Sequence, residues 1–396
     1  MLSGANVALG VTGSIAAVKV VELAHELRRR GASVRAVMSP GARGIVHPWA
    51  VEFATDNPVT TEITGSVEHV ELCGYDGWAD VLLIAPATAN TVGKVASAVD
   101  DTPVTTCATT ALGSGIPVVV APAMHEPMYD HPGVLEAIDR VESWGVSFVD
   151  PRVEEGKAKV ASQDAICLDV ARAVDDRPLE GRELVVTSGA TVEEIDPVRV
   201  LTNRSSGRTG REVARACYVA GAEVTLVHGP VGPHPIGAAV PPADHYATVR
   251  EVETEAEMRE ETLSAVEGAD ALLSAAAVGD YAVEPEAEKI RSGQRDLSLS
   301  LSPTPKLIDA VREAHPALPI VGFKAETGGH DDELIAAARE TLARVDLAFV
   351  VANDADVMGR EDSRVLLVTE TDATECEGTK WAVGERVAAK LAAELG

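Results

Sequence analysis

The sequence predicts an α/β protein built from two doubly wound domains with mostly parallel sheets. Short runs of apolar, often β-branched residues recur along the chain, and each is followed by a stretch with the periodicity of an amphipathic helix. Strands that are apolar on both faces and alternate with helices are typical of parallel sheets covered on both sides. Because 396 residues exceed what one hydrophobic core usually serves, we expect two domains of about 200 residues each.

The opening residues have the pattern of a strand, a helix and a second strand. The strand is predicted from NVALGVTG, the helix from SIAAVKVVELAHELRRRG, which closes at Gly31, and the second strand from ASVRAVMS. Two more strands that run into loops are predicted from ADVLLIAPATAN and GIPVVVAPAMHEPMY, and the helix TVGKVASAV follows the first of them. The first half is therefore expected to be doubly wound.

A charged segment, ARAVDDRPLEGR, interrupts this pattern and marks the domain boundary. It contains Pro178 and Gly181 and is followed by a fresh strand, ELVVTSGA. The predicted domains are therefore residues 1–176 and 177–396. The second domain is predicted to contain a helix from GREVARACYVAGA, strands from EVTLVHG, ADALLSAAA, PIVGFKAE and LAFVVAND, and a last helix from about Lys380.

Charge and composition exclude several classes of partner. The 62 acidic and 34 basic residues give a net charge of −28, which repels nucleic acid and anionic membrane surfaces and is typical of a halophilic source. No apolar run reaches the roughly 18 residues of a membrane span, and the first residues lack a signal-peptide pattern, so a soluble, cytoplasmic protein is expected. The 5 cysteines form no CxxC pair and suggest neither disulfides nor zinc.

Small and polar residues follow two of the predicted strands, where a ligand could approach the backbone. Gly13 and Ser14 lie where a strand turns into a helix, and the exposed N–H groups of a helix start favour a phosphate. Ala87, Thr88 and Asn90 follow another strand and suit a flat ring, so a mononucleotide flavin is suggested. A tight turn without a ligand is the structural alternative. Neither half has GxGxxG followed by an acidic residue, which disfavours an NAD-dependent dehydrogenase.

The segments TGSIAA, HVELCGYDGWAD, APATANT and PAMHEPMY, in this order, resemble the flavin-dependent cysteine decarboxylases, specifically phosphopantothenoylcysteine decarboxylase. The resemblance covers about residues 5–165 and implies a flavodoxin-like fold, with His69 as the active-site base. Oxidation of the substrate thiol by the flavin would create the electron sink that decarboxylation needs. The FMN contacts implied by the resemblance are Gly13, Ser14, Ile15, Ser39, Ala87, Thr88 and Asn90.

The substrate motif departs from the family pattern in two places. The family has PAMNxxM, whereas this chain has His125 in the position of the Asn; His125 and Met128 are implied to bind substrate, and His can also donate to a carboxylate. The family also commonly has a cysteine in the following flap, which reads PRVEEGKAKVASQ here. Cys167, Lys157 and Lys159 are alternative proton donors for the last step, unless Cys167 is a plain buried thiol.

The segment NRSSGRTG precedes an evident helix, so its N–H groups, hydroxyls and Arg208 are suited to a phosphate, with a capped helix as the structural alternative. Together with TSG, DPVR, AAVGDY, EKI and GFKAET, it is similar to phosphopantothenate–cysteine ligase in its CTP-using form, over nearly all of residues 182–396. The resemblance implies a Rossmann-like ligase fold in which Asn203 stabilises an acyl-cytidylate. The implied CTP contacts are Ser205, Ser206, Gly207, Arg208, Asp280, Lys289, Thr304, Pro305, Lys306, Leu307, Phe323 and Arg339.

The two resemblances together imply a bifunctional lyase and ligase of coenzyme A biosynthesis, of the archaeal type. The carboxylate of phosphopantothenate would attack the α-phosphate of CTP, with Mg²⁺ bridging the triphosphate, and the amine of cysteine would then displace CMP. Only small-molecule substrates are expected as partners. The resemblance also implies a homo-oligomer in which the flavin domains form trimers and the ligase domains form dimers, an arrangement that a dodecamer satisfies. FMN would then lie at a subunit boundary. Two alternatives stay open: an active ligase whose flavin domain no longer decarboxylates, and a flavin-fold regulatory binding protein.

Overall fold

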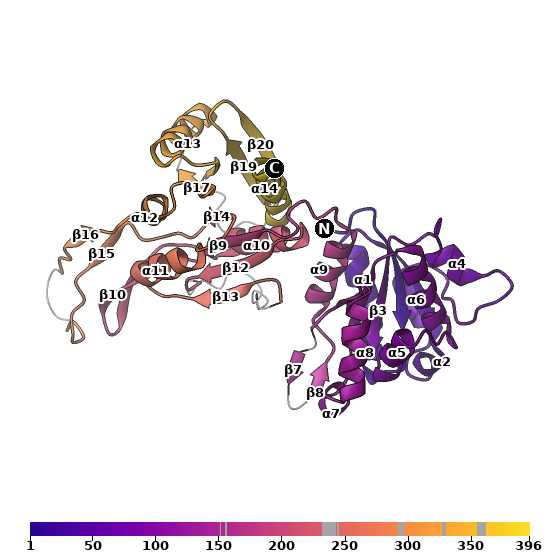
Figure 1. Ribbon diagram of the computed structural model, residues 1–396. Coiled ribbons are helices and arrows are strands. Elements are labelled where there is room, and N and C mark those ends of the chain that lie inside the picture. The colour runs from indigo at the N-terminus through magenta and orange to yellow at the C-terminus, as the bar shows by residue number, and fades with distance from the viewer. Residues whose placement is uncertain are drawn as a thin grey trace. The chain divides into compact units, whose positions relative to one another are not determined.

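A computed structural model of the chain divides into two compact units, Met1–Asp176 (unit 1) and Arg177–Gly396 (unit 2). The structure describes residues 1–150, 152–154, 157–231, 243, 245–291, 297–326, 330–354 and 362–396. Each unit has a central sheet with helices on both faces (Figure 1). Within these described ranges, no helix is both long enough and apolar enough to cross a lipid bilayer.

The sheet of unit 1 consists of 5 parallel strands in the order β2-β1-β3-β4-β6. In this order the connections change direction between β1 and β3, the point at which doubly wound sheets usually bind ligands. A second, antiparallel sheet contains β5, β7 and β8. The strands are β1 Asn6–Val11, β2 Ser33–Met38, β3 Val81–Ala87, β4 Val118–Pro122, β5 Met124–His125, β6 Ser147–Phe148, β7 Arg152–Glu154 and β8 Lys157–Lys159.

The helices of unit 1 begin and end at residues typical of helix caps. Helix α6 starts with a capping box between Thr102 and Thr105 and ends at Gly115, whose φ of 77° favours glycine. The predicted helix after Gly13 begins instead as a 3₁₀ segment, η1, before α1 follows. The helices are η1 Ile15–Lys19, α1 Val20–Arg29, α2 Pro40–Arg43, α3 Pro48–Thr55, α4 Glu68–Cys73, α5 Ala89–Ala96, α6 Pro103–Ser114, α7 Glu126–Tyr129, α8 Pro132–Glu142 and α9 Gln163–Val174.

The sheet of unit 2 has 8 strands in the order β13-β12-β9-β14-β17-β18-β19-β20. The strands from β13 to β18 are parallel and have the Rossmann order, while β19 and β20 add an antiparallel edge that the sequence did not predict. The main-sheet strands are β9 Glu183–Ser188, β12 Glu223–His228, β13 Thr248–Glu251, β14 Ala271–Ser274, β17 Ile320–Glu326, β18 Phe349–Asp354, β19 Asp362–Val368 and β20 Ala373–Thr379.

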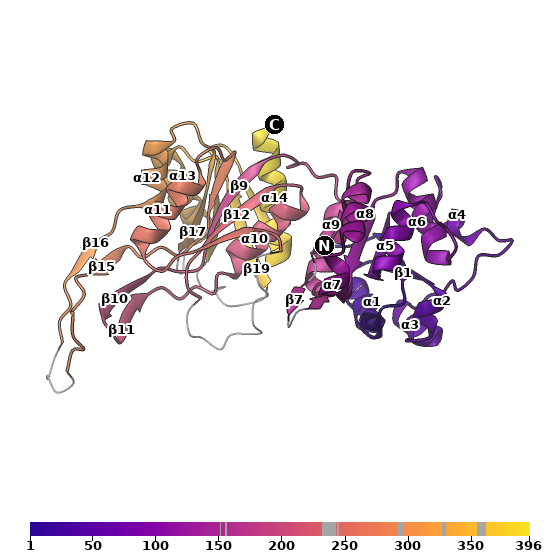
Figure 2. The same ribbon diagram turned by 60° about the horizontal axis from the view of Figure 1, so that its bottom comes forward.

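Two antiparallel pairs project from this sheet and form an arm, which was also not predicted (Figure 2). The hairpin pairs β10 Val192–Asp196 with β11 Arg199–Thr202, and the second pair joins β15 Tyr281–Val283 to β16 Leu301–Pro303. The backbone N–H of Glu286 donates to the carbonyl of Ile195 at 3.0 Å, so the two pairs lie side by side.

The helices of unit 2 cover the two faces of the main sheet separately. Helices α11, α12 and α13 pack on one face around a core that includes Met258, Val311 and Ala338. Helices α10 and α14 lie side by side on the other face (Figure 1). The helices are α10 Arg208–Val219, α11 Glu255–Ala265, α12 Leu307–Ala314, α13 Asp331–Val345 and α14 Lys380–Leu395.

Helices α10 and α14 touch through their backbones at Gly384. A Cβ atom on Gly384 would lie 2.6 Å from the carbonyl oxygen of Glu212 and 3.2 Å from the Cβ of Ala216. Lys380, one turn before Gly384 in α14, interacts electrostatically with Glu212 and with Arg208, which lies one turn before Glu212 in α10. The two helices therefore run parallel, and they start at the same edge of the sheet.

We predict that Gly384→Ala destabilises unit 2 although alanine is the better helix former. The added methyl group would collide with the backbone of α10, and overpacking of this kind costs about 1–3 kcal/mol. The matched control is Gly113→Ala in α6, where a Cβ would meet nothing within 4 Å. The free energy of unfolding of that variant should stay unchanged or rise by up to about 1 kcal/mol. Urea denaturation of both variants measures the difference, and equal stabilities would contradict the close approach of the helices.

Candidate functional site

In unit 1, hydrogen bonds join the loops that follow neighbouring strands into one surface. The hydroxyl of Thr12, which is 2% exposed, donates to the carbonyl of Pro86 at 2.7 Å and accepts from the N–H of Thr88 at 3.2 Å. The hydroxyl of Ser14 donates to the carbonyl of Ala123 at 2.9 Å. The loops after β1, β3 and β4 are therefore fixed to one another at the carboxyl edge of the sheet.

The loop after β2 completes this surface through a close contact between two glycines. A Cβ on Gly13 would lie 3.1 Å from the Cα of Gly41, so a larger residue at Gly13 would separate the loops. Ser39 donates its backbone N–H to the carbonyl of Val11 at 3.0 Å, and its hydroxyl accepts from the first turn of α2. Ile15, the first residue of η1, is 76% exposed.

The structure therefore brings the predicted flavin contacts to one edge of the sheet. Ala87 is buried at the end of β3, Thr88 caps α5 through the N–H of Thr91, and Asn90 is exposed in the first turn of that helix. Small side chains and helix starts leave backbone N–H groups accessible, which suits the phosphate and the ring of a mononucleotide. The residues present fit a flavin mononucleotide.

His69 lies on α4, the short helix before β3. Its Nδ1 atom is buried and has no hydrogen-bond partner. The start of α4 is held by Glu68, whose pKa is lowered because the hydroxyl and the backbone N–H of Thr64 donate to its carboxylate. Figure 1 and Figure 2 both show α4 well separated from α7, which carries Met128. One chain thus does not bring His69 to Met128.

The substrate motif lies on a separate small sheet. His125 is exposed on β5, which pairs with Lys157 on β8, and Met128 follows on α7 with 48% of its side chain exposed. The side chains of Lys157 and Lys159 lie outside the described residues. Cys167 is fully buried on α9 and interacts electrostatically with Arg30 at the end of α1. It is therefore a buried thiol at the opposite edge of the sheet and does not replace the flap cysteine.

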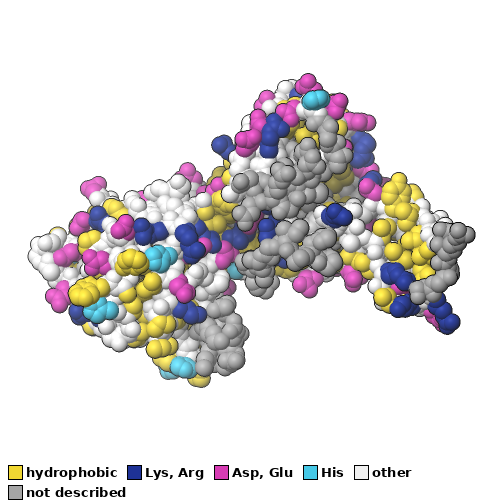
Figure 3. Space-filling view, turned by 180° about the vertical axis from the view of Figure 1, so that it is seen from behind, with side chains coloured by type: hydrophobic (Ala, Val, Ile, Leu, Met, Phe, Trp, Pro, Cys, Tyr) yellow, Lys and Arg dark blue, Asp and Glu magenta, His cyan; other side chains and the backbone are white. Residues whose placement is uncertain are grey.

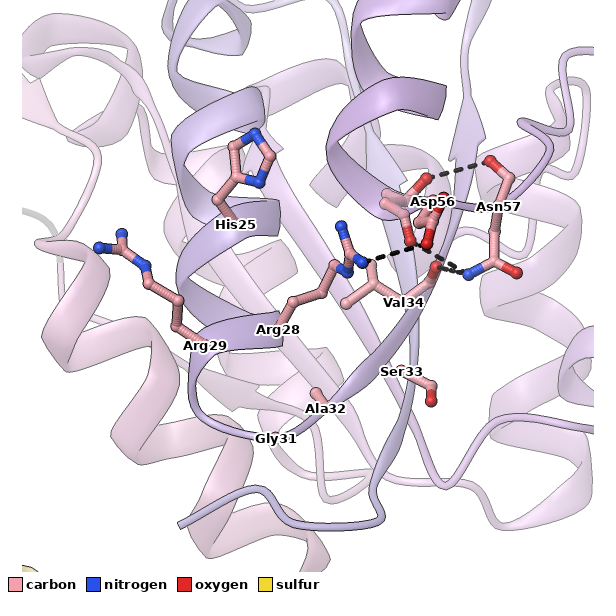
Figure 4. Close-up of a pocket in the computed structure, with 10 residues that line it drawn as sticks. His25, Arg28, Arg29, Gly31, Ala32, Ser33, Val34, Asp56 and Asn57 are labelled. Carbon is pink, nitrogen blue, oxygen red and sulfur yellow. Dashed lines mark hydrogen bonds and ion pairs between the residues drawn. The ribbon is translucent and has the colours of Figure 1, made fainter.

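A cavity of about 800 Å³ lies at this opposite edge, near the start of β2 (Figure 4). Arg28 donates to the carbonyl of Ala54 at 3.0 Å and pairs with Asp56 at 3.3 Å, while the amide of Asn57 donates to the carbonyl of Val34 at 2.9 Å. Because these polar groups already have partners within the protein, we assign them a structural role.

In unit 2, a buried threonine again joins the loops on either side of the change in strand order. Thr191 is 1% exposed, and its hydroxyl accepts from the N–H of Gly279 at 2.8 Å. The side-chain amide of Asn203, which follows β11, donates to the carbonyls of Ala277 and Val278, both at 3.2 Å. The loops after β9, β11 and β14 therefore meet around Asn203.

Three of the residues predicted to bind the nucleotide lie next to the loops around Asn203. They are Asp280, Thr304 and Lys306. The hydroxyl of Thr304 donates to the carbonyl of Gly279 at 2.6 Å, and its N–H donates to the carbonyl of Asp280 at 3.0 Å. Lys306 forms an ion pair with Asp280. Pro305 lies between Thr304 and Lys306, Leu307 begins α12 with its side chain in the core, and Phe323 is half-buried on β17.

The predicted phosphate loop, Ser205–Arg208, forms the start of α10. The hydroxyl of Ser188 at the end of β9 donates to the carbonyl of Gly207 at 2.8 Å, and the N–H of Gly207 donates to the hydroxyl of Ser205 at 3.3 Å. Gly207 has a φ of 65°, and a Cβ there would lie 3.0 Å from Cε1 of His228. A glycine is therefore required where the loop meets the sheet. Ser206 lies within this loop, next to Gly207.

Lys289 is placed away from Asp280, at the turn of the β10–β11 hairpin. The carboxylate of Asp196 accepts from the N–H of the next residue, Ile290, at 3.1 Å, and the guanidinium of Arg199 donates to the Ile290 carbonyl at 3.2 Å. Within one chain, the backbone contacts hold Lys289 at the arm rather than beside the other nucleotide contacts.

Arg339 is also not brought to this site, contrary to the prediction. Its Nε donates to the carbonyl of Thr369 at 3.3 Å, just beyond the end of β19. Because β19 runs antiparallel to β18, its end lies at the amino edge of the parallel strands, opposite the phosphate loop. Arg344, near the end of α13, pairs with Asp309 at 2.7 Å. The described residues contain no cluster of three or more metal-ligating side chains.

Comparison with known proteins gives matches to both units. Residues 1–174 match the family described as Flavoprotein, and residues 179–395 match the DNA/pantothenate metabolism flavoprotein C-terminal domain. The coenzyme A biosynthesis bifunctional protein CoaBC of Thermococcus kodakarensis is 49% identical over 93% of this chain and 89% of its own length. The protein of that name from Methanocaldococcus jannaschii is 32% identical over 99% of this chain and 94% of its own length.

A solved structure is similar as well. The DNA/pantothenate metabolism flavoprotein from Streptococcus pneumoniae is 26% identical and aligns with 54% of this chain and 98% of its own, with a TM-score of 0.47.

His228 is a residue of this site that no motif indicated. It ends β12 with 8% of its surface exposed, and its Nε2 lies 2.8 Å from a guanidinium nitrogen of Arg211. Burial and the positive charge of Arg211 lower the pKa of His228 to about 4. The ring is therefore neutral at physiological pH, and its Nε2 accepts a hydrogen bond from Arg211.

We predict that His228 makes unit 2 less stable as the pH falls from about 6.5 to about 4. Over this interval the unfolded chain binds a proton at His228 that the folded chain does not bind, so protonation favours unfolding, by about 3 kcal/mol at the acid end. Calorimetric unfolding at a series of pH values, compared between the wild type and His228→Gln, isolates this contribution. A pH dependence identical in the two proteins would contradict the prediction.

Proposed function

The chain belongs to the family of bifunctional coenzyme A biosynthesis proteins, and we propose that unit 1 carries the decarboxylase site and unit 2 the ligase site. One observation carries the assignment of residues. In each unit, the loops at the change in strand order are hydrogen-bonded to one another, and they hold Ser14 and Thr88 in unit 1 and Asn203 and Asp280 in unit 2. This is where doubly wound domains bind nucleotides.

In unit 1, we propose that the surface around Gly13, Ser14 and Thr88 holds FMN. The contact between Gly13 and Gly41 brings backbone N–H groups close together for the phosphate, and the exposed side chain of Ile15 offers an apolar face to a flat ring. The bound flavin would supply reversible two-electron chemistry, which allows decarboxylation without net oxidation.

His69 and His125 would act on the substrate. A neutral imidazole at His69 can take the proton of the substrate thiol, and its buried Nδ1 has no partner within the chain. His125, exposed on β5, can donate to the carboxylate that leaves as CO₂. Because α4 and α7 lie apart in one chain, we infer that His69 of one subunit completes the site of a neighbouring subunit, as a trimer would allow.

Exposed apolar surface supports assembly of both units. In unit 1, Trp49 and Phe53 on α3 are 77% and 78% exposed. In unit 2, hydrophobic side chains gather over the arm (Figure 3). The exposed apolar residues on the arm are Val198, Val200, Tyr281, Leu297, Leu299 and Leu301. Patches of this kind mark contacts between proteins, so we propose that α3 and the arm contact further copies of this chain.

We predict that His69→Ala binds FMN and releases no CO₂ from phosphopantothenoylcysteine, since the flavin surface lies on other loops. Flavin absorbance of the purified chain measures binding, and trapping of CO₂ measures the reaction. A wild type that holds FMN without releasing CO₂ would instead favour the alternative of an inert flavin domain.

Mixing two inactive variants tests whether one decarboxylase site uses residues from two subunits. When His69→Ala and His125→Ala chains are mixed and reassembled, some sites would combine an intact His69 with an intact His125. Partial return of CO₂ release indicates a shared site, whereas a mixture as inactive as its components would place both residues in one subunit.

In unit 2, we propose that the loops around Asn203 and the start of α10 bind CTP and phosphopantothenate. The N–H groups of Ser205–Arg208 would hold phosphate, and Mg²⁺ bound together with the nucleotide would offset the charge of the triphosphate. The carboxylate of phosphopantothenate would attack the α-phosphate and release pyrophosphate, after which the amine of cysteine displaces CMP. Asn203 donates its amide to two backbone carbonyls, which orients its side-chain oxygen to accept from that amine.

We predict that Asn203→Ala lowers the ligase rate constant by about 10²–10³-fold, the usual effect of removing one preorganised polar contact. Amide formation from CTP, phosphopantothenate and cysteine measures the ligase. Release of CO₂ from supplied phosphopantothenoylcysteine by the same preparation is the internal control and should be unchanged. A ligase rate within a few-fold of wild type would exclude a role for Asn203 in the reaction.

A further inference from the structure

Lys380 lies where the N-terminal ends of α10 and α14 meet, near Arg208 of the predicted phosphate loop. It is the first residue of α14, and its Nζ lies 3.0 Å from the hydroxyl of Ser363 at the beginning of β19. Because β19 is antiparallel to β18, its beginning lies at the carboxyl edge of the parallel strands. Figure 2 shows α14 alongside α10, and the close contact at Gly384 keeps the two helices in register.

The first turns of these two helices carry positively charged side chains in place of acidic ones. A helix start attracts acidic residues, and the first turns of α11, α12 and α13 each contain one or more. The first turns of α10 and α14 contain none and instead carry Arg208 and Lys380. Positive helix ends and two cations therefore converge in a chain with a net charge of −28.

No carboxylate among the described residues lies within ion-pair distance of Lys380, which bonds only to the neutral Ser363. Its pKa is lowered by burial and by Arg208, and Glu212 offsets this in part. A half-buried ammonium without a carboxylate at ion-pair distance is costly, which is typical of a group whose partner is a ligand.

A buried donor without a partner lies on the sheet side of the same helix start. His228 is 8% exposed, its ring contacts Gly207, and its Nε2 is bonded to Arg211, so its proton is on Nδ1. That Nδ1 has no partner, and neither has the buried indole N–H of Trp381, next to Lys380. Unpaired buried donors are rare, and of these two one lies beside Gly207 before α10 and the other is in the first turn of α14.

We propose that Lys380 binds a phosphate group of a ligase substrate, together with Arg208 and the N–H groups at the start of α10. The inference rests on the proposed ligase function of unit 2 and adds to it a residue outside every motif used to predict the site. A phosphate would neutralise the converging charges and accept from the unpaired donors. Both CTP and phosphopantothenate carry such a group, so either could be the ligand.

The test compares Lys380→Gln, Lys380→Arg and a matched control, Lys390→Gln. Lys390 lies on the same helix and pairs with Glu394 on the surface at 3.4 Å. Isothermal titration of the full-length chain with pyrophosphate, CTP or phosphopantothenate gives a dissociation constant for each. Lys380→Gln should weaken the binding of at least one ligand by about 10–100-fold, as expected for a lost charge-assisted contact. Lys380→Arg should stay within a few-fold, and Lys390→Gln should match the wild type.

The ligand that is affected identifies the phosphate. Loss confined to CTP and pyrophosphate assigns Lys380 to the triphosphate, and loss confined to phosphopantothenate assigns it to that substrate. Unchanged dissociation constants for all three overturn the proposal, as does equal weakening by Lys390→Gln. If the wild type binds pyrophosphate through Lys380 but forms no amide, the ligase proposal fails and the phosphate site stands. Thermal unfolding and the release of CO₂ by unit 1 show that each variant is folded.

Discussion

In each unit, a buried threonine holds together the two loops between which a ligand would bind. Thr12 bonds the loop after β1 to the loop after β3, and Thr191 bonds the loop after β9 to the loop after β14. Parallel strands end at one edge with their last backbone groups unpaired, and short hydroxyl side chains are small enough to satisfy those groups between crowded loops. The positions of Ser14, Thr88, Asn203 and the other site residues depend on these bonds.

Much of this arrangement could be predicted from the sequence. The runs of apolar residues that predicted strands correspond to β1, β3, β4, β9, β12 and β14, because strands buried on both faces have a pattern that few other structures share. The polar residues directly after those strands reached the expected edge for the same reason, since the ends of parallel strands must meet there. Thr12 and Thr88, which follow β1 and β3, are brought together in this way.

The sequence was least informative where distant contacts decide the structure. The β10–β11 hairpin has no alternating apolar pattern, and its turn is held by Asp196, which bonds to Ile290 far along the chain. Strand β19 is as apolar as its parallel neighbours, so its antiparallel direction could not be inferred. That direction also explains why Arg339 lies near Thr369, at the edge opposite the one expected. Lys380 carries no motif, and only its neighbours indicate its role.

The threonine bonds also bear on the thermodynamics of ligand capture. Loops that are already fixed to one another lose little conformational entropy when a ligand arrives, so more of each contact contributes to affinity. The loops that carry Thr12 and Thr88 owe their shape to hydrogen bonds within the chain rather than to a bound molecule. The flavin site should consequently keep its form while empty, and cofactor exchange would not require unfolding of unit 1.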